Sequence, residues 1–147
     1  MAIIVYDDEY FMRQALLEAA AALEEDEIPI GCVIVCNDRV VARGHNMTQR
    51  LQDSTSHAEM IAITAAQEAL GSKYLRECTI YVTVEPCIMC AGAIMWSQIG
   101  RLVYGASDEK KGYSQLCNPF NKKMQIKSGV MEGECKTILQ NFFLKKR

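Results

Sequence analysis

Two short motifs in this chain carry residues that can bind a metal ion and transfer protons. His57-Ala58-Glu59 is followed by Pro86-Cys87-Ile88-Met89-Cys90. His57, Cys87 and Cys90 offer one imidazole and two thiolates, which are ligands that zinc prefers. Three protein ligands leave the fourth position of a tetrahedral zinc open for water, and the metal lowers the pKa of that water from about 15.7 to roughly 7. Because Glu59 adds a carboxylate that can carry protons, the two motifs predict a catalytic zinc site.

Each motif also has a structural interpretation when it is taken alone. The stretch from Ser56 to Glu59 has the pattern of a capping box at the start of a helix, in which the glutamate serves a backbone N–H group. Cys87-x-x-Cys90 is compatible with a redox dithiol or with half of a structural zinc site. The sequence has no second Cys-x-x-Cys pair that could complete a four-thiolate site. The joint pattern therefore favours the catalytic zinc.

The other cysteines, the second histidine and the single tryptophan are expected to be structural. A fourth ligand from His45 would close the zinc to water, so we interpret His45 as a loop residue. Trp96 is expected to pack in the core or in a dimer interface. The remaining cysteines lie among apolar residues and are expected in the core. They are Cys32, Cys36, Cys78, Cys117 and Cys135.

The length and composition indicate one domain that spans residues 1–147, since 50% of the residues are hydrophobic and no repeat or linker interrupts the chain. Acidic residues at positions 7–9 come too early for a secretory signal, and no run of about 18 apolar residues could cross a membrane. Seven cysteines, an odd number, argue against a disulfide framework and for a reducing compartment. We expect a cytoplasmic protein.

The charge is distributed unevenly along the chain. Residues 1–100 contain six Lys/Arg and fourteen Asp/Glu, a net of −8, whereas residues 101–147 contain ten and four, a net of +6, which gives the total of −2. A basic C-terminal third is compatible with contacts to phosphate groups, although any one lysine pair is more typical of a solvated face. The lysine pairs favour a phosphate partner only if the fold brings them together.

Periodicity and turn residues predict helices alternating with strands. Asn37-Asp38 is a plausible two-residue hairpin turn, and Pro86 is expected at the first position of a helix. Helices are expected at residues 8 to about 24, 57–70, from 86 onward and 134–145, and strands at 32–36, 39–43, 79–84, 102–105 and 125–130. This order predicts an α/β protein, a three-layer α/β/α sandwich with a central mixed sheet and both metal motifs at helix N-termini.

With these residues in view, the chain resembles the cytidine and deoxycytidylate deaminase superfamily, and within it the bacterial tRNA-specific adenosine deaminases. H-x-E and P-C-x-x-C are the general signature of zinc nucleobase deaminases. The resemblance extends over most of the chain, and the residues around Cys87 are the most specific. The matching segments are 28–31, 44–46, 57–59, 81–94, 103–106 and Phe142-Phe143 with the basic end that follows.

The resemblance implies a cytidine deaminase-like fold, one Zn²⁺ per subunit of a homodimer, and hydrolytic conversion of adenosine to inosine at the wobble position of the tRNA anticodon. It implies that His57, Cys87 and Cys90 hold the metal and that Glu59 is catalytic. The residues that it implies for substrate binding are Asn46, Ile28, Pro29, Ala58, Asp108, Lys110, Phe143, Lys145, Lys146 and Arg147. Without the resemblance, Asn46 after a glycine is more typical of a turn.

Two other functions stay open from the sequence. The same zinc chemistry could deaminate a free base such as guanine or cytosine, or a nucleotide, and the basic end would then have no role. Alternatively, the chain could be an inactive RNA-binding subunit whose zinc only stabilises the fold. Glu59 argues against this last hypothesis, since a structural zinc needs no carboxylate beside it.

Overall fold

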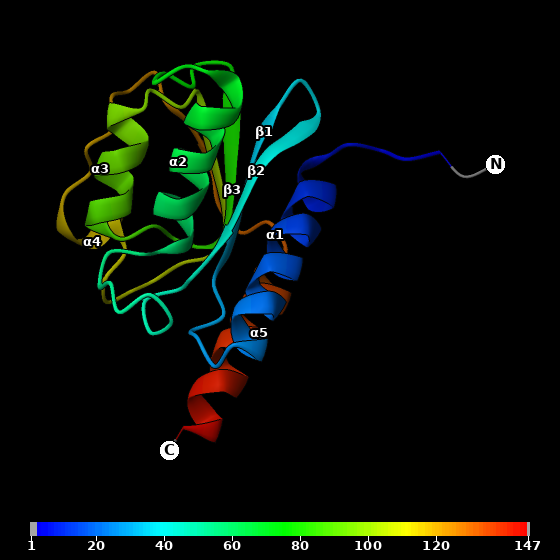
Figure 1. Ribbon diagram of the computed structural model, residues 1–147, viewed down its shortest axis with the longest axis vertical. Coiled ribbons are helices and arrows are strands. Elements are labelled where there is room, and N and C mark those ends of the chain that lie inside the picture. The colour runs from blue at the N-terminus through cyan, green and yellow to red at the C-terminus, as the bar shows by residue number, and fades with distance from the viewer. Residues whose placement is uncertain (1–2, 147) are drawn as a thin grey trace.

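The computed structural model describes residues 3–146 and contains helices on both faces of one sheet (Figure 1). Its elements in chain order are α1 (Asp8–Glu24), β1 (Gly31–Cys36), β2 (Arg39–His45), α2 (Ala58–Leu70), β3 (Cys78–Val84), α3 (Ile88–Trp96), β4 (Arg101–Ala106), α4 (Tyr113–Leu116), β5 (Gln125–Lys127) and α5 (Glu132–Lys145). No helix within residues 3–146 has the length and apolar character needed to cross a bilayer.

The five strands form a mixed sheet in the order β2-β1-β3-β4-β5. Strand β1 is antiparallel to β2 and β3, while β4 is parallel to β3 and β5. The carboxyl ends of β3 and β4 therefore lie at the same edge as the start of β1 and the end of β2. In sheets of this kind, ligands bind outside the carboxyl ends of the parallel strands. We call this the carboxyl edge of the sheet.

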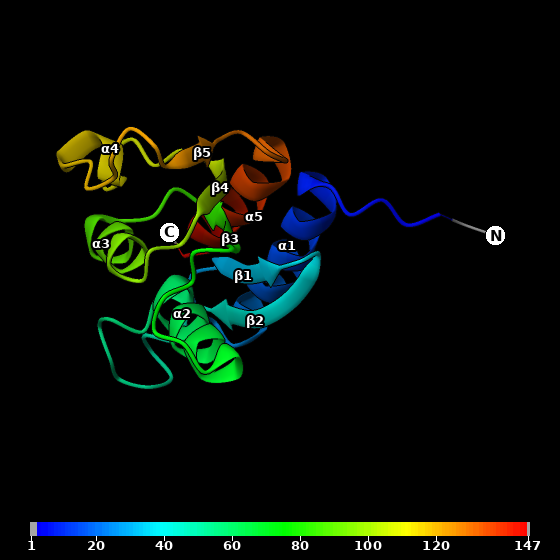
Figure 2. The same ribbon diagram turned by 90° about the horizontal axis from the view of Figure 1, so that it is seen from above.

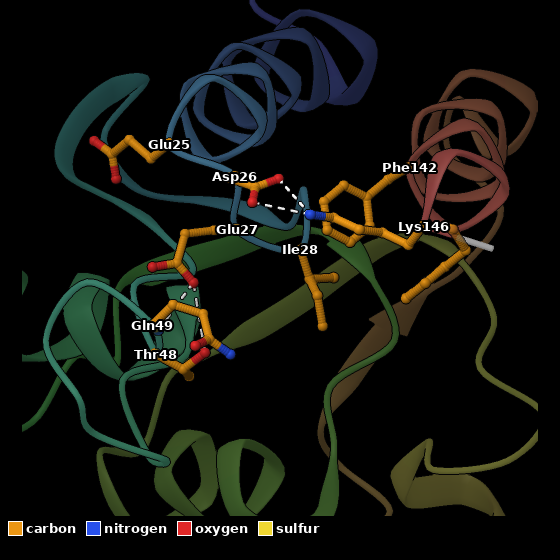
Figure 3. A pocket seen from close by; sticks show the side chains of 9 residues that line it. Glu25, Asp26, Glu27, Ile28, Thr48, Gln49, Phe142 and Lys146 are labelled. Atoms are coloured by element: carbon orange, nitrogen blue, oxygen red, sulfur yellow. Dashed lines mark hydrogen bonds and ion pairs between the residues drawn. The ribbon is translucent and has the colours of Figure 1, made fainter.

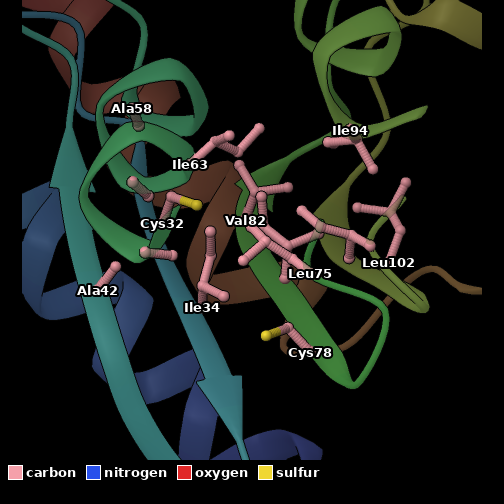
Figure 4. Close-up of a cluster of buried hydrophobic side chains, with 14 of the residues drawn as sticks. Cys32, Ile34, Ala42, Ala58, Ile63, Leu75, Cys78, Val82, Ile94 and Leu102 are labelled. Carbon is pink, nitrogen blue, oxygen red and sulfur yellow. The ribbon is translucent and has the colours of Figure 1, made fainter. Parts of the chain in front are cut away.

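The sheet is the middle of three layers, as predicted. Helices α2 and α3 cover one face, and α1 and α5 cover the other (Figure 1, Figure 2). Strand β1 is buried on both sides, because Ile34 packs toward α2 and α3 whereas Val33 packs toward α1. Ile34, Val82 and Leu102 are fully buried between the sheet and the helices α2 and α3 (Figure 4).

A tight turn joins β1 to β2, and one glycine lets β2 lie close to the start of α2. Asn37 and Asp38 both have positive φ, 52° and 60°, the conformation of a type I′ turn, so the predicted two-residue hairpin is confirmed. A Cβ atom at Gly44 would meet the carbonyl oxygen of Ala58. Only glycine lets β2 and the first turn of α2 approach this closely.

Several predicted boundaries and burials are wrong. Strand β5 ends at Lys127 instead of residue 130, since the chain then turns through Gly129 with φ of 79°, and α5 begins at Glu132. The short helix α4 was not predicted. Cys117 lies in an exposed loop instead of the core, Cys36 is only partly buried, and Trp96 is 76% exposed, which excludes a core position within this chain.

Candidate metal centre and substrate site

The start of α2 presents His57 and Glu59 at the carboxyl edge of the sheet. His57 is the N-cap residue, with extended backbone (φ −75°, ψ 157°), and its side chain makes no capping hydrogen bond. The alternative capping box from Ser56 to Glu59 does not form, because the N-cap is His57 instead of Ser56. The Ser56 hydroxyl donates to Asp53 Oδ2 at 2.7 Å. The imidazole of His57 is thus free to serve as a ligand. Glu59 lies in the first turn and is 3% exposed.

The start of α3 presents the two cysteines. Cys87 is the N-cap residue, and Cys90 lies in the first turn and is buried. The prediction that Pro86 occupies the first helical position is wrong, since Pro86 precedes the cap and its carbonyl accepts a hydrogen bond from the Tyr113 N–H at 3.0 Å. Both metal motifs do lie at helix N-termini, where free N–H groups stabilise thiolates.

The three ligand atoms have the spacing of a tetrahedral zinc site. His57 Nδ1 lies 3.6 Å from Cys87 Sγ and 3.5 Å from Cys90 Sγ. Zinc–nitrogen bonds of about 2.05 Å and zinc–sulfur bonds of about 2.3 Å at tetrahedral angles place nitrogen and sulfur about 3.5 Å apart. Within residues 3–146, these three residues are the group whose geometry suits a metal ion. The donor set and its geometry therefore fit zinc.

His45 does not complete the coordination. Its ring nitrogens face Glu18 Oε1 at 3.4 Å and Glu25 Oε2 at 3.1 Å, so it joins the end of β2 to α1. His45 therefore has a structural contact, but the expectation that it is a loop residue is wrong, since it is the last residue of β2. Within the part of the chain that the structure describes, the ligand group has three protein members, which leaves a fourth position for water or substrate.

Proximity and burial shift the pKa values of the site residues. The neighbouring Cys90 and the His57 ring lower the pKa of Cys87 to about 4, so this thiol is ionised at neutral pH. The Cys87 side chain raises the pKa of His57 in turn. Burial raises the pKa of Glu59 to about 7. A carboxyl group with that pKa can both accept and donate a proton near neutral pH.

Comparison with known proteins supports this reading of the site. The zinc-binding region of cytidine and deoxycytidylate deaminases matches residues 5–106, which include all three candidate ligands and Glu59. The chain belongs to this family.

The relatives of this deaminase chain include enzymes that act on tRNA. It is 44% identical to the tRNA-specific adenosine deaminase of Bacillus subtilis, over 95% of this chain and 91% of that protein. It is 41% identical to the chloroplastic tRNA(adenine(34)) deaminase of Arabidopsis thaliana over 92% of its own length, and spans 12% of that longer protein.

Solved structures of deaminases are also similar to this chain. A structure from work on A-to-I editing by tRNA:A34 deaminases at the wobble position of transfer RNA has a TM-score of 0.81 and 45% identity, over 88% of this chain and 99% of that one. A guanine deaminase from Bacillus subtilis has a TM-score of 0.66 and 36% identity, over 69% of this chain and 65% of that one.

Several residues implied for substrate binding lie around a hollow of about 510 Å³ near the carboxyl edge of the sheet (Figure 3). Ile28, Phe143 and Lys146 line it, together with Thr48 and Gln49, but the metal ligands do not. The hollow is therefore a neighbouring groove and not the metal centre.

Other implied residues are less accessible. Pro29 and Ala58 are buried, so each can only support a pocket from beneath. Asn46 is 5% exposed and follows β2, where its N–H donates to the Ile30 carbonyl at 3.1 Å. It begins the loop that leads to His57.

The implied RNA contacts within residues 3–146 differ in their pairing with other residues. Asp108 Oδ1 accepts from the N–H groups of Lys110 and Lys111 at 3.0 Å each, so Asp108 shapes the turn that exposes both lysines. Lys146 Nζ pairs with Asp26 at 2.8 Å, whereas Lys145 is exposed at the end of α5. Arg147 lies outside the described residues.

Sequence reasoning missed Glu85. Its side chain is 3% exposed and accepts hydrogen bonds from Asp108 N at 3.2 Å, Ser114 N at 3.0 Å and Ser114 Oγ at 2.7 Å. Glu85 thus ties the loop of residues 108–114 to the segment that holds Cys87. A charged residue at the end of the apolar run 80–84, directly before Pro86, was the available signal.

Proposed function

We propose that this chain is a zinc-dependent hydrolase that deaminates adenosine to inosine at the wobble position of tRNA. The observation that carries the proposal is the arrangement of one imidazole and two sulfurs at tetrahedral spacing beside a buried carboxylate. The tRNA substrate is supported by relatives of more than 40% identity over nearly the whole chain.

In this proposal His57, Cys87 and Cys90 hold the zinc ion. Zinc, when bound, supplies an activated water by lowering the pKa of that water toward 7. The thiolate of Cys87, stabilised by its neighbours, is ready to coordinate at neutral pH. The short Nδ1–sulfur distances mean that the ligands need little rearrangement to bind the metal.

Glu59 would move the protons of the reaction. As a carboxylate it would accept a proton from the attacking water, and as an acid it would pass that proton to the purine ring. It would then accept the proton of the new hydroxyl on C6 and deliver it to the amine, which departs as ammonia when the C6–N bond breaks. Burial suits both roles, because it keeps the two protonation states close in energy near pH 7. The water attacks C6 of an adenine that is unstacked in the anticodon loop or flipped out of it.

Substrate recognition would use the carboxyl edge of the sheet. Asn46 hydrogen-bonds the purine, Ile28 contacts it, and Pro29 and Ala58 support the pocket from below. Phe143 and Lys146 extend this surface along the hollow, and Lys110 and Lys145 project free cations toward phosphates. Asp108 contributes through the turn that it stabilises. Arg147 belongs to the same proposed backbone contacts.

We further propose a cytoplasmic homodimer in which each subunit is one deaminase domain of residues 1–147. Helix α3 supports the dimer, because its sequence of nine residues has no charged side chain. Its apolar residues Ile88, Met95 and Trp96 are 47%, 37% and 76% exposed. Such a face is typical of protein–protein contacts, and tryptophan is a frequent centre of them.

Deamination of free guanine is the second candidate, favoured by the likeness to the guanine deaminase structure. The test is the rate of ammonia release from an anticodon stem-loop with adenosine at the wobble position, from guanine and from cytidine, at several salt concentrations. The proposal predicts turnover of the stem-loop that weakens steeply with salt, since RNA binding releases counterions. Fast, salt-insensitive turnover of guanine without turnover of the stem-loop would refute the RNA substrate and leave the zinc hydrolase intact.

A further inference from the structure

Glu27 is a buried carboxylate that contacts the loop between β2 and α2. It lies between α1 and β1 and is 1% exposed. Its oxygens accept hydrogen bonds from Arg50 N at 2.8 Å, Gln49 N at 3.1 Å and Thr48 Oγ1 at 3.5 Å. Figure 3 shows Glu27 beside Thr48 and Gln49. All three donors belong to one short stretch of the loop, residues 48–50.

These hydrogen bonds are what stabilises the buried charge. Within the described residues, no lysine, arginine or histidine forms an ion pair with Glu27, and the guanidinium of Arg50 pairs with Glu25 instead. An isolated carboxylate that loses its water is strongly unfavourable unless donors replace the water. The position of residues 48–50 and the burial of Glu27 therefore depend on each other.

The loop that Glu27 holds connects two parts of the site. It begins at Asn46, whose N–H is bonded to the Ile30 carbonyl, and it ends at the metal ligand His57. Thr48 and Gln49 form one wall of the hollow that Ile28 and Phe143 also line. A shift of residues 48–50 would change the width of this hollow and the orientation of Asn46.

We propose that Glu27 is a positioning residue for the substrate: it keeps the 46–50 segment in the one conformation that accepts the target nucleotide. The proposal rests on the proposed function, because the nucleotide is the adenosine of that reaction. Glu27 touches neither the metal ligands nor Glu59 through any hydrogen bond in the described chain. Its loss should therefore affect substrate binding more than the chemical step.

The experiment compares Glu27→Gln and Glu27→Ala with the wild-type protein, with zinc bound. We expect faster hydrogen exchange at the backbone amides of Gln49 and Arg50, and one zinc per chain as in the wild type. For the stem-loop, KM should rise about tenfold in Glu27→Ala if the competent loop conformation falls to about a tenth of the population, with kcat within about twofold. Glu27→Gln should show a smaller rise, since its carbonyl oxygen still accepts one of the bonds.

Asp8→Asn is the matched control for a loss of stability alone. Asp8 is also a partly buried carboxylate with several hydrogen-bond donors, but it bonds Arg101 at the start of β4, at the opposite edge of the sheet. It should lower Tm without changing KM. An equal rise of KM in Asp8→Asn, or an unchanged KM or unchanged amide exchange in both Glu27 variants, would overturn the positioning role.

The proposed function can fail separately in the same experiment. If the wild-type protein converts no stem-loop adenosine, the tRNA assignment is wrong and the role of Glu27 toward that substrate is wrong with it. Amide exchange and zinc content are measured without substrate, so they still report whether Glu27 holds the loop. If Glu27→Ala does not fold, Glu27→Gln, which keeps the side-chain volume, decides the outcome by the same criteria.

Discussion

Removal of the two lysine charges on the turn after β4 should weaken the salt dependence of RNA binding. Lys110 and Lys111 are exposed, and neither forms an ion pair within the described residues. Their backbone N–H groups bond to Asp108 Oδ1, so Lys110→Ala and Lys111→Ala together leave the turn intact and remove only charge. A phosphate contact in a single-stranded loop contributes about 0.7 to the slope of log K against log salt.

Two contacts should therefore lower that slope by up to about 1.4. When the salt concentration rises from 50 to 200 mM, the factor by which the binding constant falls should be about sevenfold smaller in the double variant than in the wild type. The assay is stem-loop binding at a series of salt concentrations.

Lys136→Ala is the control, since Lys136 is exposed but pairs with Glu132 at 3.2 Å on the outer side of α5. It should leave the slope unchanged. If the double variant keeps the wild-type slope, or if Lys136→Ala lowers it equally, the turn does not contact phosphates and the proposed RNA surface is wrong.

Three further predictions concern the site and the fold. Glu59→Gln should keep one zinc per chain and lose about 10²–10⁴-fold in kcat, and full activity in this variant would exclude the proton-transfer role. Cys87→Ala should lose tightly bound zinc in metal analysis and melt at a lower temperature, because metal binding stabilises the folded state; unchanged zinc content would contradict the ligand assignment. The Arg101 guanidinium donates two hydrogen bonds of 2.8 Å to Asp8 and holds the pKa of Asp8 well below its usual value of 3.8. The contribution of this ion pair to the free energy of unfolding is therefore fully present above pH 3.8 and is lost as the pH falls through the folded-state pKa of Asp8. Asp8→Asn should therefore cost about 1 kcal/mol at pH 7, discounted for partial exposure, and the difference in unfolding free energy from wild type should shrink in acid; a pH-independent difference would show that the ion pair is not its origin.

The metal site could be predicted from the sequence because its information is local. His57 and Glu59 lie two residues apart, and Cys87 and Cys90 three, so one helix start fixes each pair. The alternation of helices and strands then places both helix starts at the same edge of a sheet. The three-layer fold and the hairpin at Asn37-Asp38 follow from the same short-range patterns and are confirmed.

The remaining features depend on contacts between distant segments. Glu85 bonds to residues 23 and 29 positions away, and Glu27 to residues 21 to 23 positions away, so neither role is visible in a local pattern. The alternative capping box is absent because the helix begins one residue later than that pattern requires, with His57 as its N-cap. Trp96 was expected in the core or in a dimer interface, and its exposure excludes the core of this chain. The roles of the substrate residues remain predictions.

The most direct test of the central claim is sequencing of unmodified tRNA transcripts after incubation with the zinc-loaded protein. Inosine is read as guanosine, so each converted adenosine is located in the sequence. The account predicts conversion at position 34 in transcripts that carry adenosine there, and at no other adenosine. Absence of inosine at position 34, or inosine spread over other loops, would contradict it.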